Sequence, residues 1–342
     1  MRLLVTGGAG FIGSNFIRMM LAQHPDREVV NVDKLTYAGN LDNLADMGGD
    51  CRHTFIRADI ADREQMNEIL ERHRPDAIVN FAAESHVDRS ILDASPFIET
   101  NVKGTQVLLE ATRKYEVKRF IQISTDEVYG SLGETGTFTE ESPLQPNSPY
   151  AASKAAADML CRSYHKAYSL PIIVTRSSNN YGPYQFPEKL IPLMIRNALS
   201  GEPLPVYGEG KQVRDWLYVD DNCRAIELVL QHGEIGEVYN IGGNCEEKNI
   251  DVVELICTIL HSLPETEGLR PEIRFMRDPR GAAHDFRYAL DSSKVREELG
   301  WEESRELKRG LTQTVQWYLE NQDWVERVIT GEYQEYYRTL YG

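Results

Sequence analysis

The chain has 342 residues, of which 41% are hydrophobic and 26% charged, ordinary values for a folded globular protein. That length predicts one large or two medium domains and excludes a small disulfide-stabilised protein. The formal net charge of −16, from 37 basic and 53 acidic residues, disfavours nucleic acid and anionic membranes as partners. An anionic substrate would therefore need cations placed locally against this field.

Cysteine usage and the N-terminus bear on the compartment. The five cysteines are an odd number without a CxxC pair, so their spacing predicts neither a disulfide framework nor a metal site. Thr6 and Gly7 interrupt the first apolar run too early for a signal peptide. No stretch approaches the roughly 20 apolar residues of a membrane helix. We therefore expect a cytoplasmic protein.

The first 180 residues alternate short apolar runs with helical patterns, which predicts βαβ units and a parallel sheet. We expect strands at Arg2 to Thr6, Glu28 to Val32, His53 to Arg57, Ala77 to Phe81, Arg119 to Ser124 and Ile172 to Arg176. The gaps predict helices such as Gly13 to Gln23, Arg63 to His73, Ile98 to Tyr115 and Pro149 to Tyr168. For the last of these, Ser148 suits the N-cap and Pro149 the first helical position.

Beyond Asn180 the elements become shorter and are separated by Pro and Gly, as in Phe186 to Ser200, Val213 to Val219 and Val238 to Ile241. This change predicts a doubly wound α/β fold of Rossmann type with a smaller, interleaved C-terminal lobe. We expect residues 1–178 and about 212–243 in a dinucleotide-binding domain, and 179–211 and about 244–342 in a substrate lobe. The connection Ser131 to Ser148 has the length of a lid or binding loop.

A glycine-rich turn follows the first predicted strand. Gly8, Gly10 and Gly13 satisfy GxGxxG and open the first helix, whose free amides can hold a pyrophosphate. Asp33, at the end of the second strand, can accept hydrogen bonds from an adenosine ribose and would repel a 2′-phosphate. Although Lys34 adjoins it, the pattern favours NAD over NADP. A turn that serves only helix packing is the alternative.

Asp59 ends the third predicted strand, as Asp33 ends the second. It could reach the adenine, and capping of the next helix is an equally simple reading.

Tyr150 and Lys154 lie four residues apart in the predicted helix, and so on one face. The ammonium and the helix N-terminus both favour a phenolate, so we expect a lowered pKa for Tyr150, as a general base for an alcohol needs. An exposed Tyr and Lys on a solvated face is the alternative.

Thr125, Asp126 and Glu127 follow the fifth predicted strand, at the edge where open α/β sheets bind ligands. Two adjacent carboxylates cannot both ionise easily, so their pKa values should separate into one acid and one base. On residue types alone, a polar turn that caps the strand is the favoured interpretation.

These residues carry a resemblance that spans nearly the whole chain. The sequence resembles the extended short-chain dehydrogenases/reductases, and among them is similar to the nucleotide-sugar 4,6-dehydratases. The similar blocks are TGGAGFIGSNF (Thr6 to Phe16), FAAESHVDRSI (Phe81 to Ile91), TNVKGT (Thr100 to Thr105), STDEVYG (Ser124 to Gly130), YAASKA (Tyr150 to Ala155), SNNYGPYQFPEKLIP (Ser178 to Pro192), VYGEGKQVRDWLYVDD (Val206 to Asp221) and YNIGG (Tyr239 to Gly243). The Thr-Asp-Glu triplet is the most specific, since related epimerases and decarboxylases keep the Tyr and Lys without this acidic pair.

The resemblance implies a lyase that uses tightly held NAD on a nucleotide sugar, dTDP-glucose, as a step toward deoxysugars such as dTDP-rhamnose. It implies catalytic roles for Thr125, Asp126, Glu127, Tyr150 and Lys154. It places the NAD site at Gly7, Gly10, Phe11, Ile12, Gly13, Asp33, Lys34, Leu35, Thr36, Asp59, Ile60, Ala82, Ala83, Thr100, Tyr150, Lys154 and Asn180. It places the nucleotide-sugar site at Ser85, Thr125, Asn179, Lys189, Leu190, Pro205, Tyr207, Arg214, Asn249, Arg280, His284 and Tyr288.

Within that set we expect Lys189, Arg214 and Arg280 to form a local cationic patch. Arg214 suits the diphosphate because guanidinium binds phosphate bidentately, and a surface ion pair with Asp215 is the alternative. The segment Arg280 to Asp285 reads RGAAHD, one residue longer than the usual RPGHD of the family, which affects the register of Arg280 against His284.

Family members also imply a homodimer through helices such as Ile98 to Tyr115 and Pro149 to Tyr168. The alternatives for function are a UDP- or GDP-sugar dehydratase, a 4-epimerase or decarboxylase, and an NAD-binding scaffold without catalysis.

Overall fold

The computed structural model describes residues 1–281 and 284–329, which form a seven-stranded parallel sheet and two smaller sheets. The strand order of the large sheet is β10-β6-β5-β4-β1-β2-β3. Its strands are β1 (Arg2–Thr6), β2 (Glu28–Asp33), β3 (His53–Arg57), β4 (Ala77–Asn80), β5 (Arg119–Thr125), β6 (Ile172–Ser177) and β10 (Val238–Ile241). The order reverses between β1 and β4, and such a switch point is where doubly wound sheets bind ligands.

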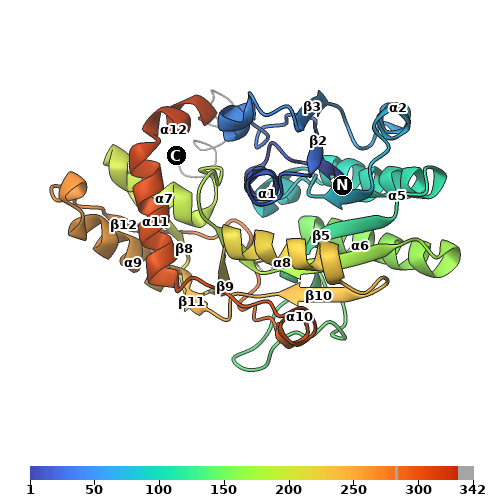
Figure 1. The fold of residues 1–342 in the computed structure, drawn as a ribbon. Helices are drawn as coiled ribbons and strands as arrows, with labels where there is room; N and C mark the ends of the chain where they lie inside the picture. Colours follow the sequence, from blue (N-terminus) through green and yellow to red (C-terminus); the bar gives the residue numbers. More distant parts are fainter. Residues whose placement is uncertain (282–283, 330–342) are drawn as a thin grey trace.

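Helices cover both faces of this sheet, which confirms the Rossmann-type fold class (Figure 1). One layer consists of α1 (Phe11–Gln23), α8 (Val219–His232) and α10 (Ser293–Leu299), and its core includes Phe16, Ile17, Ile226 and Val295. The other layer consists of α2 (Arg63–His73), α5 (Thr105–Lys114) and α6 (Pro149–Tyr168), and its core includes Met66, Leu108 and Cys161. The alternating apolar strands are therefore buried from both sides, as parallel sheets require.

The smaller sheets and the remaining long helices gather at one end of the molecule, on the left of Figure 1. A three-stranded sheet contains β7 (Asn179–Tyr181), β9 (Val213–Tyr218) and β11 (Glu246–Lys248), and β8 (Leu204–Tyr207) pairs with β12 (Ile273–Met276). A separate core joins α7 (Leu190–Ser200), α9 (Asn249–Ser262), α11 (Leu307–Glu320) and α12 (Gln322–Val328). We propose that this core marks a substrate lobe, whose chain is interleaved with the large sheet because β10 returns to it.

The strands lie close to their predicted positions, but two helical predictions need correction. The element expected over Phe186 to Ser200 is a helix that begins only at Leu190. The helix expected over Ile98 to Tyr115 opens with a π-helical turn, η2 (Ile98–Gly104), before α5. In that turn the Asn101 side chain bonds both backbone groups of Glu84 (2.9 and 3.0 Å) and Ser153 Oγ (2.8 Å). These hydrogen bonds stabilise the wider π-helical turn. Such turns are frequent at functional sites.

The remaining elements are short: η1 (Leu41–Met47), α3 (Val87–Leu92), α4 (Ser95–Phe97), η3 (Asp126–Tyr129) and η4 (Pro264–Thr266). Among the described helices, none combines the length and hydropathy that a membrane crossing demands.

Candidate active site

The glycine-rich turn between β1 and α1 forms one wall of a cavity at the switch point. Gly7 has a φ of +68°, and a Cβ there would lie 2.5 Å from the backbone N of Ala82. A Cβ on Gly13 would lie 2.4 Å from the carbonyl O of Gly7. A Cβ on Gly10 would have its nearest neighbour 3.3 Å away, and no side chain of the residues that the structure describes caps the amides of α1. The turn is thus tightly packed at Gly7 and Gly13 and less crowded at Gly10, which fits a pyrophosphate bound in the cavity.

Asp33 lies at the end of β2, beside this turn. Its carboxylate accepts hydrogen bonds from the amides of Ala9 (3.0 Å) and Leu35 (2.8 Å), which fix it at the cavity wall. Lys34 forms an ion pair with Asp59 at 2.6 Å across the mouth of the cavity. The cap of α2 is Asp62, so the capping alternative for Asp59 is wrong.

Most residues predicted for NAD line this cavity. They are Gly7, Gly10, Phe11, Ile12, Gly13, Asp33, Lys34, Thr36, Asp59, Ile60, Ala82, Ala83, Thr100, Tyr150 and Lys154. Leu35 is not in this lining, and its left-handed backbone (φ +60°) instead brings its amide to Asp33. Asn180 lies in the neighbouring cavity.

The second cavity holds most of the residues predicted for the nucleotide sugar. They are Asn179, Lys189, Leu190, Pro205, Tyr207, Arg214, Asn249, Arg280, His284 and Tyr288. Ser85 lines the first cavity, and Gln185, Glu188 and Lys189 line both. The two cavities therefore adjoin, so that a cofactor in one could touch a sugar in the other.

The three predicted cations meet in this second cavity rather than on open surface. Lys189 Nζ donates to the carbonyl O of Ser85 at 2.8 Å, and Arg280 pairs with buried Asp88. Arg214 is 6% exposed and donates to the carbonyl oxygens of Val213 (2.8 Å) and Asp285 (2.9 Å). Its position excludes the surface ion-pair alternative.

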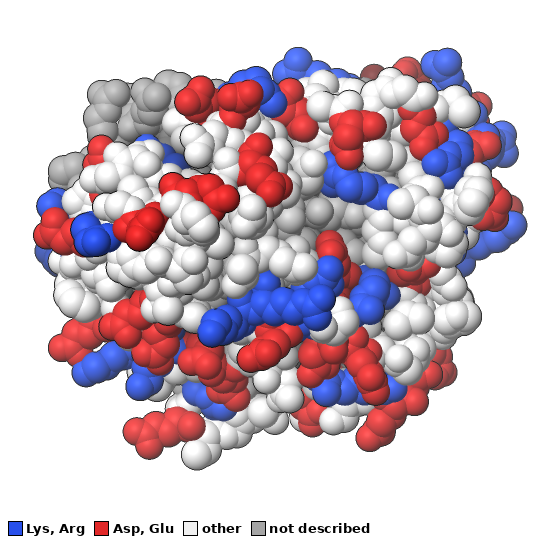
Figure 2. Space-filling view, turned by 60° about the vertical axis from the view of Figure 1, so that its left-hand side comes forward, with Lys and Arg blue, Asp and Glu red and all other residues white. Residues whose placement is uncertain are grey.

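Acidic residues outnumber basic ones in the chain, 53 against 37. On the face shown in Figure 2, basic side chains gather in a band beside a recess, whereas acidic side chains are spread around it. The local cations therefore face an overall charge of −16.

The acidic pair lies where β5 ends and η3 begins, at the sheet edge predicted from the sequence. Thr125 Oγ1 accepts from the amide of Glu127 (3.3 Å) and donates to Asp126 Oδ1 (3.1 Å). Asp126 is 2% exposed, and its Oδ2 has no hydrogen-bond partner among the described residues. Glu127 lines the second cavity, whereas Thr125, which was predicted to line it, and Asp126 belong to neither cavity lining.

The two carboxyl groups have different surroundings. Burial, and then the charge of Glu127, raise the pKa of Asp126 well above its ordinary value. Burial also raises the pKa of Glu127, but Lys189, Arg214 and Arg280 oppose that rise. The arrangement thus favours a protonated Asp126 beside an ionised Glu127.

Tyr150 and Lys154 lie in the first two turns of α6, where the Ser148 side chain accepts from the amide of Ala151 at 3.1 Å. Lys154 Nζ donates to the carbonyl O of Ile123, and burial lowers its pKa to about 8. Our expectation for Tyr150 needs correction, because burial and the charge of Glu127 raise its pKa, although a hydrogen bond with Thr125 opposes them. Desolvation of the phenolate outweighs the neighbouring cation and the helix N-terminus.

The connection Ser131 to Ser148 is fastened at several points. Its Leu132 and Phe138 amides donate to the carbonyl oxygens of Arg287 (3.0 Å) and Ala289 (2.9 Å). Phe138 also stacks on Tyr129, with 4.9 Å between ring centroids. The loop thus braces the segment that carries Tyr288 against the catalytic turn.

The register after Arg280 is accommodated despite the extra residue. Arg280 and His284 both line the second cavity, and His284 Nδ1 pairs with Asp278. Ala282 and Ala283, which lie between them, are outside the described residues.

Glu188 is a cavity residue that sequence reasoning missed. It lines both cavities, and its Oε2 lies 3.4 Å from Arg89 Nε and 3.9 Å from His86 Nε2. Burial raises its pKa to about 7. Its place beside Lys189 within the similar block was the available signal.

Known proteins match the chain along most of its length. The family model GDP-mannose 4,6 dehydratase matches residues 4–314. The dTDP-glucose 4,6-dehydratase of Xanthomonas campestris pv. campestris (strain B100) is 54% identical, with 97% of each chain covered.

Solved structures agree with this. The dTDP-glucose 4,6-dehydratase of Streptomyces venezuelae, solved with NAD bound, is 50% identical, with a TM-score of 0.90 over 96% of this chain and all of that one (100%). The UDP-glucose 4-epimerase of Thermotoga maritima is 32% identical, with a TM-score of 0.84 over 94% and 100% of the two chains. The chain therefore belongs to the family of the nucleotide-sugar 4,6-dehydratases and, within it, to the dTDP-glucose 4,6-dehydratases.

Proposed function

We propose that the protein converts dTDP-glucose to dTDP-4-keto-6-deoxyglucose and water, with NAD that stays bound throughout. The observation that carries this reaction is the pair of neighbouring carboxyl groups in unlike surroundings. Asp126 is buried with an oxygen left unbonded by the described residues, whereas Glu127 faces three cations in the second cavity. An elimination needs such a pair, because one group must remove a proton from carbon and the other must protonate the departing oxygen.

The first cavity fits NAD by the chemistry of its lining. The open turn at Gly10 suits the pyrophosphate and Asp33 suits the adenosine ribose. When bound there, NAD supplies the redox chemistry, taking hydride from C4 of the sugar and returning it to C6.

In the first half of the reaction, Tyr150 removes the proton of the C4 hydroxyl. Because burial raises the pKa of Tyr150, its phenolate needs a partner charge, which we assign to the Lys154 ammonium one turn along α6. Thr125 holds the phenol oxygen by a hydrogen bond and so orients it toward C4.

In the second half, Glu127 removes the C5 proton, which the 4-ketone has made acidic. Asp126 donates its proton to the C6 hydroxyl, which leaves as water. Glu127, which lines the second cavity, exchanges the abstracted proton with solvent and then protonates C5. Tyr150 gives up the proton that it took from the C4 hydroxyl and Asp126 takes one up, so the protein ends the cycle as it began.

The cationic wall holds the diphosphate of the substrate. The guanidinium of Arg214 donates hydrogen bonds to backbone carbonyl oxygens, so its position is fixed before substrate binds. Its ring contact with Tyr288, 4.6 Å from guanidinium carbon to ring centroid, fixes it further. Such preorganisation lowers the entropy lost on binding.

The direct test is an assay of purified protein with dTDP-glucose and UDP-glucose in parallel, without added NAD, in deuterated water. We expect a 4-keto-6-deoxy product from dTDP-glucose, labelled at C5. A C4 epimer with unlabelled C5 would identify an epimerase instead, and preference for UDP-glucose would reject the thymidine nucleotide. Absence of any turnover would favour the scaffold alternative.

We also propose a cytoplasmic homodimer that supplies deoxysugar synthesis such as that of dTDP-rhamnose. The exposed apolar side chains Ile91, Leu92, Ile98 and Met159 support a dimer, because η2 packs on α6 and so brings Ile98 and Met159 to adjoining helices. The unpaired cysteines suit a reducing compartment. Light scattering should show a dimer that Met159→Asp dissociates, and an unchanged mass would move the interface elsewhere.

A further inference from the structure

A buried arginine connects the two elements that carry the catalytic side chains. Arg176 belongs to β6 and is 4% exposed. Its Nε donates to Asp158 Oδ2 at 3.0 Å, and its Nη1 donates to the hydroxyl of Tyr129 at 2.8 Å. One rigid guanidinium therefore holds two partners from different elements at once.

Each partner belongs to one half of the proposed reaction. Asp158 follows Lys154 by one turn and Tyr150 by two turns, so all three share a face of α6. Tyr129 is the last residue of η3, the short helix that begins with Asp126 and Glu127. Through these two partners, Arg176 connects the helix that carries Tyr150 to the short helix that carries Asp126 and Glu127.

The arm toward η3 is firmly held. The hydroxyl of Tyr129 donates to Asn240 Oδ1 at 2.7 Å, and the guanidinium carbon lies 4.8 Å from the centroid of its ring. Arg176 pairs with Ser124 in the sheet, directly before the catalytic turn. Such a network allows little independent movement of η3 and α6.

Arg176, Asp158 and Tyr129 stand behind the site rather than in it. Within the described residues, the linings of the two cavities contain none of the three. Asp158 and Arg176 are 1% and 4% exposed, and their side chains are paired with each other. Their role in the reaction must act through other residues.

We propose that Arg176 is a positioning residue that sets the spacing between Tyr150 and the Asp126–Glu127 pair, through Asp158 and Tyr129. The proposal rests on the proposed function, in which both groups must serve one sugar that does not leave the site. Tyr150 acts at C4, and the acidic pair acts at C5 and C6, so their separation must match the ring. A displacement of about 1 Å can slow such a step by about a hundredfold.

Two variants break one arm each. Tyr129→Phe removes the bond to η3 and leaves Asp158 paired, so oxidation should persist while elimination slows by about tenfold. The fraction of enzyme with NADH absorbance during turnover should then rise, and deuterium should enter C5 more slowly. Asp158→Asn weakens the arm to α6, so oxidation should slow by about tenfold and the NADH fraction should fall. KM for dTDP-glucose should stay near the wild-type value in both.

Arg176→Lys keeps the charge but lacks the planar guanidinium that holds both partners in fixed directions, and should lower kcat about tenfold with a changed NADH fraction. Tyr239→Phe is the matched control, since Tyr239 is also fully buried and its hydroxyl donates to Glu298 at 2.9 Å, outside both cavities. It should cost stability yet keep the wild-type NADH fraction.

A wild-type NADH fraction in both Tyr129→Phe and Asp158→Asn would overturn the positioning role, as would equal shifts in the Tyr239→Phe control. If Arg176→Lys does not fold, the two single-arm variants still decide the question. Failure of the proposed function would be seen separately, as wild-type protein that does not dehydrate dTDP-glucose.

Discussion

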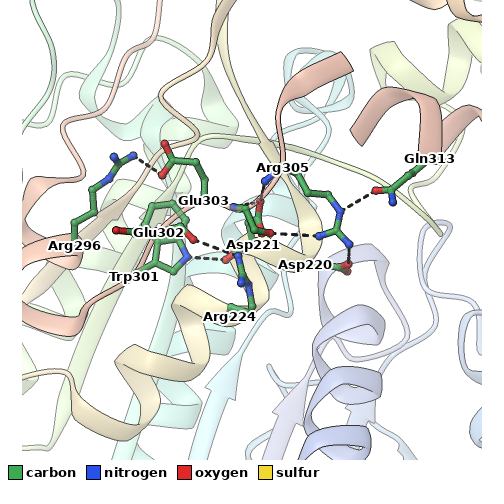
Figure 3. A network of polar contacts seen from close by, with 10 residues as sticks. Asp220, Asp221, Arg224, Arg296, Trp301, Glu302, Glu303, Arg305 and Gln313 are labelled. Carbon is green, nitrogen blue, oxygen red and sulfur yellow. Dashed lines mark hydrogen bonds and ion pairs between the residues drawn. The ribbon is translucent and has the colours of Figure 1, made fainter. Parts of the chain in front are cut away.

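Asp221 and Asp126 are both buried aspartates, but among the described residues only Asp221 has hydrogen-bond donors at both carboxylate oxygens. Asp221, in the first turn of α8, is 0% exposed and accepts four hydrogen bonds at its carboxylate. The donors are Arg224 Nη2 (2.5 Å), Ser304 Oγ (2.7 Å) and the amides of Ser304 and Arg305 (both 3.1 Å). The indole of Trp301 adds a bond to its backbone carbonyl at 3.0 Å (Figure 3).

Among the described residues Asp126 has a single donor, the hydroxyl of Thr125, and the carboxylate of Glu127 follows directly in the chain. Asp221 thus connects α8 to the segment that leads into α11. In contrast, Asp126 Oδ2 has no hydrogen-bond donor among the described residues. A carboxyl group with all its donors in place stabilises the fold, and one left incomplete next to a cavity-lining residue such as Glu127 is available for chemistry.

The largest effect should follow from Glu127→Gln. The amide cannot remove the C5 proton, so we expect turnover to fall about a thousandfold. NADH absorbance should still develop on mixing with dTDP-glucose, because Tyr150 is intact. Unchanged turnover would reject Glu127 as the carbon base.

Asp126→Asn should lower kcat about a hundredfold, because the amide is a poor acid toward the departing hydroxyl. Thermal unfolding should occur at about the same temperature, since a neutral amide replaces a buried carboxyl group that is short of hydrogen-bond donors and already favours its neutral form. A clear loss of stability would mean that Asp126 is a structural group like Asp221.

Asp221→Asn should show the reverse pattern. The new amide group would face donors, so we expect a loss of about 2 kcal/mol in the free energy of unfolding. Below the unfolding temperature, turnover per folded molecule should remain near wild type. Denaturant titration and active-site titration together measure both quantities, and lost turnover in folded protein would break the contrast.

The smallest effect concerns Glu188, whose pKa is raised to about 7 by burial. A folded pKa above the unfolded one stabilises the protein at low pH, and that stability is lost as pH rises from about 4.5 toward about 7. Glu188→Gln should therefore flatten the fall in unfolding temperature between those values. Parallel curves for variant and wild type would show that Glu188 ionises normally.

Local rules predicted much of the fold and many cavity residues. Ser148 and Pro149 mark the start of α6 because capping depends on adjacent residues. The glycine turn and Asp33 likewise belong to one βα unit, so their spacing carries the information.

Features that depend on distant partners escaped prediction. The π-helical turn at η2 depends on Asn101 meeting Glu84 and Ser153, which only the tertiary fold brings together. The raised pKa of Tyr150 arises from burial, which no helical spacing reports. The place of Glu188 in both cavity linings likewise depends on how distant segments pack, so its sequence position alone did not predict it.

The cations of the nucleotide-sugar site are buried within a protein of net charge −16, and this has a kinetic consequence. A dianionic substrate must first approach against a repulsive long-range field and is attracted only after it enters the recess. Added salt screens the long-range part more than the buried contacts. At low substrate concentration, capture of dTDP-glucose should therefore become faster as ionic strength rises modestly, whereas a surface cationic patch would make it slower.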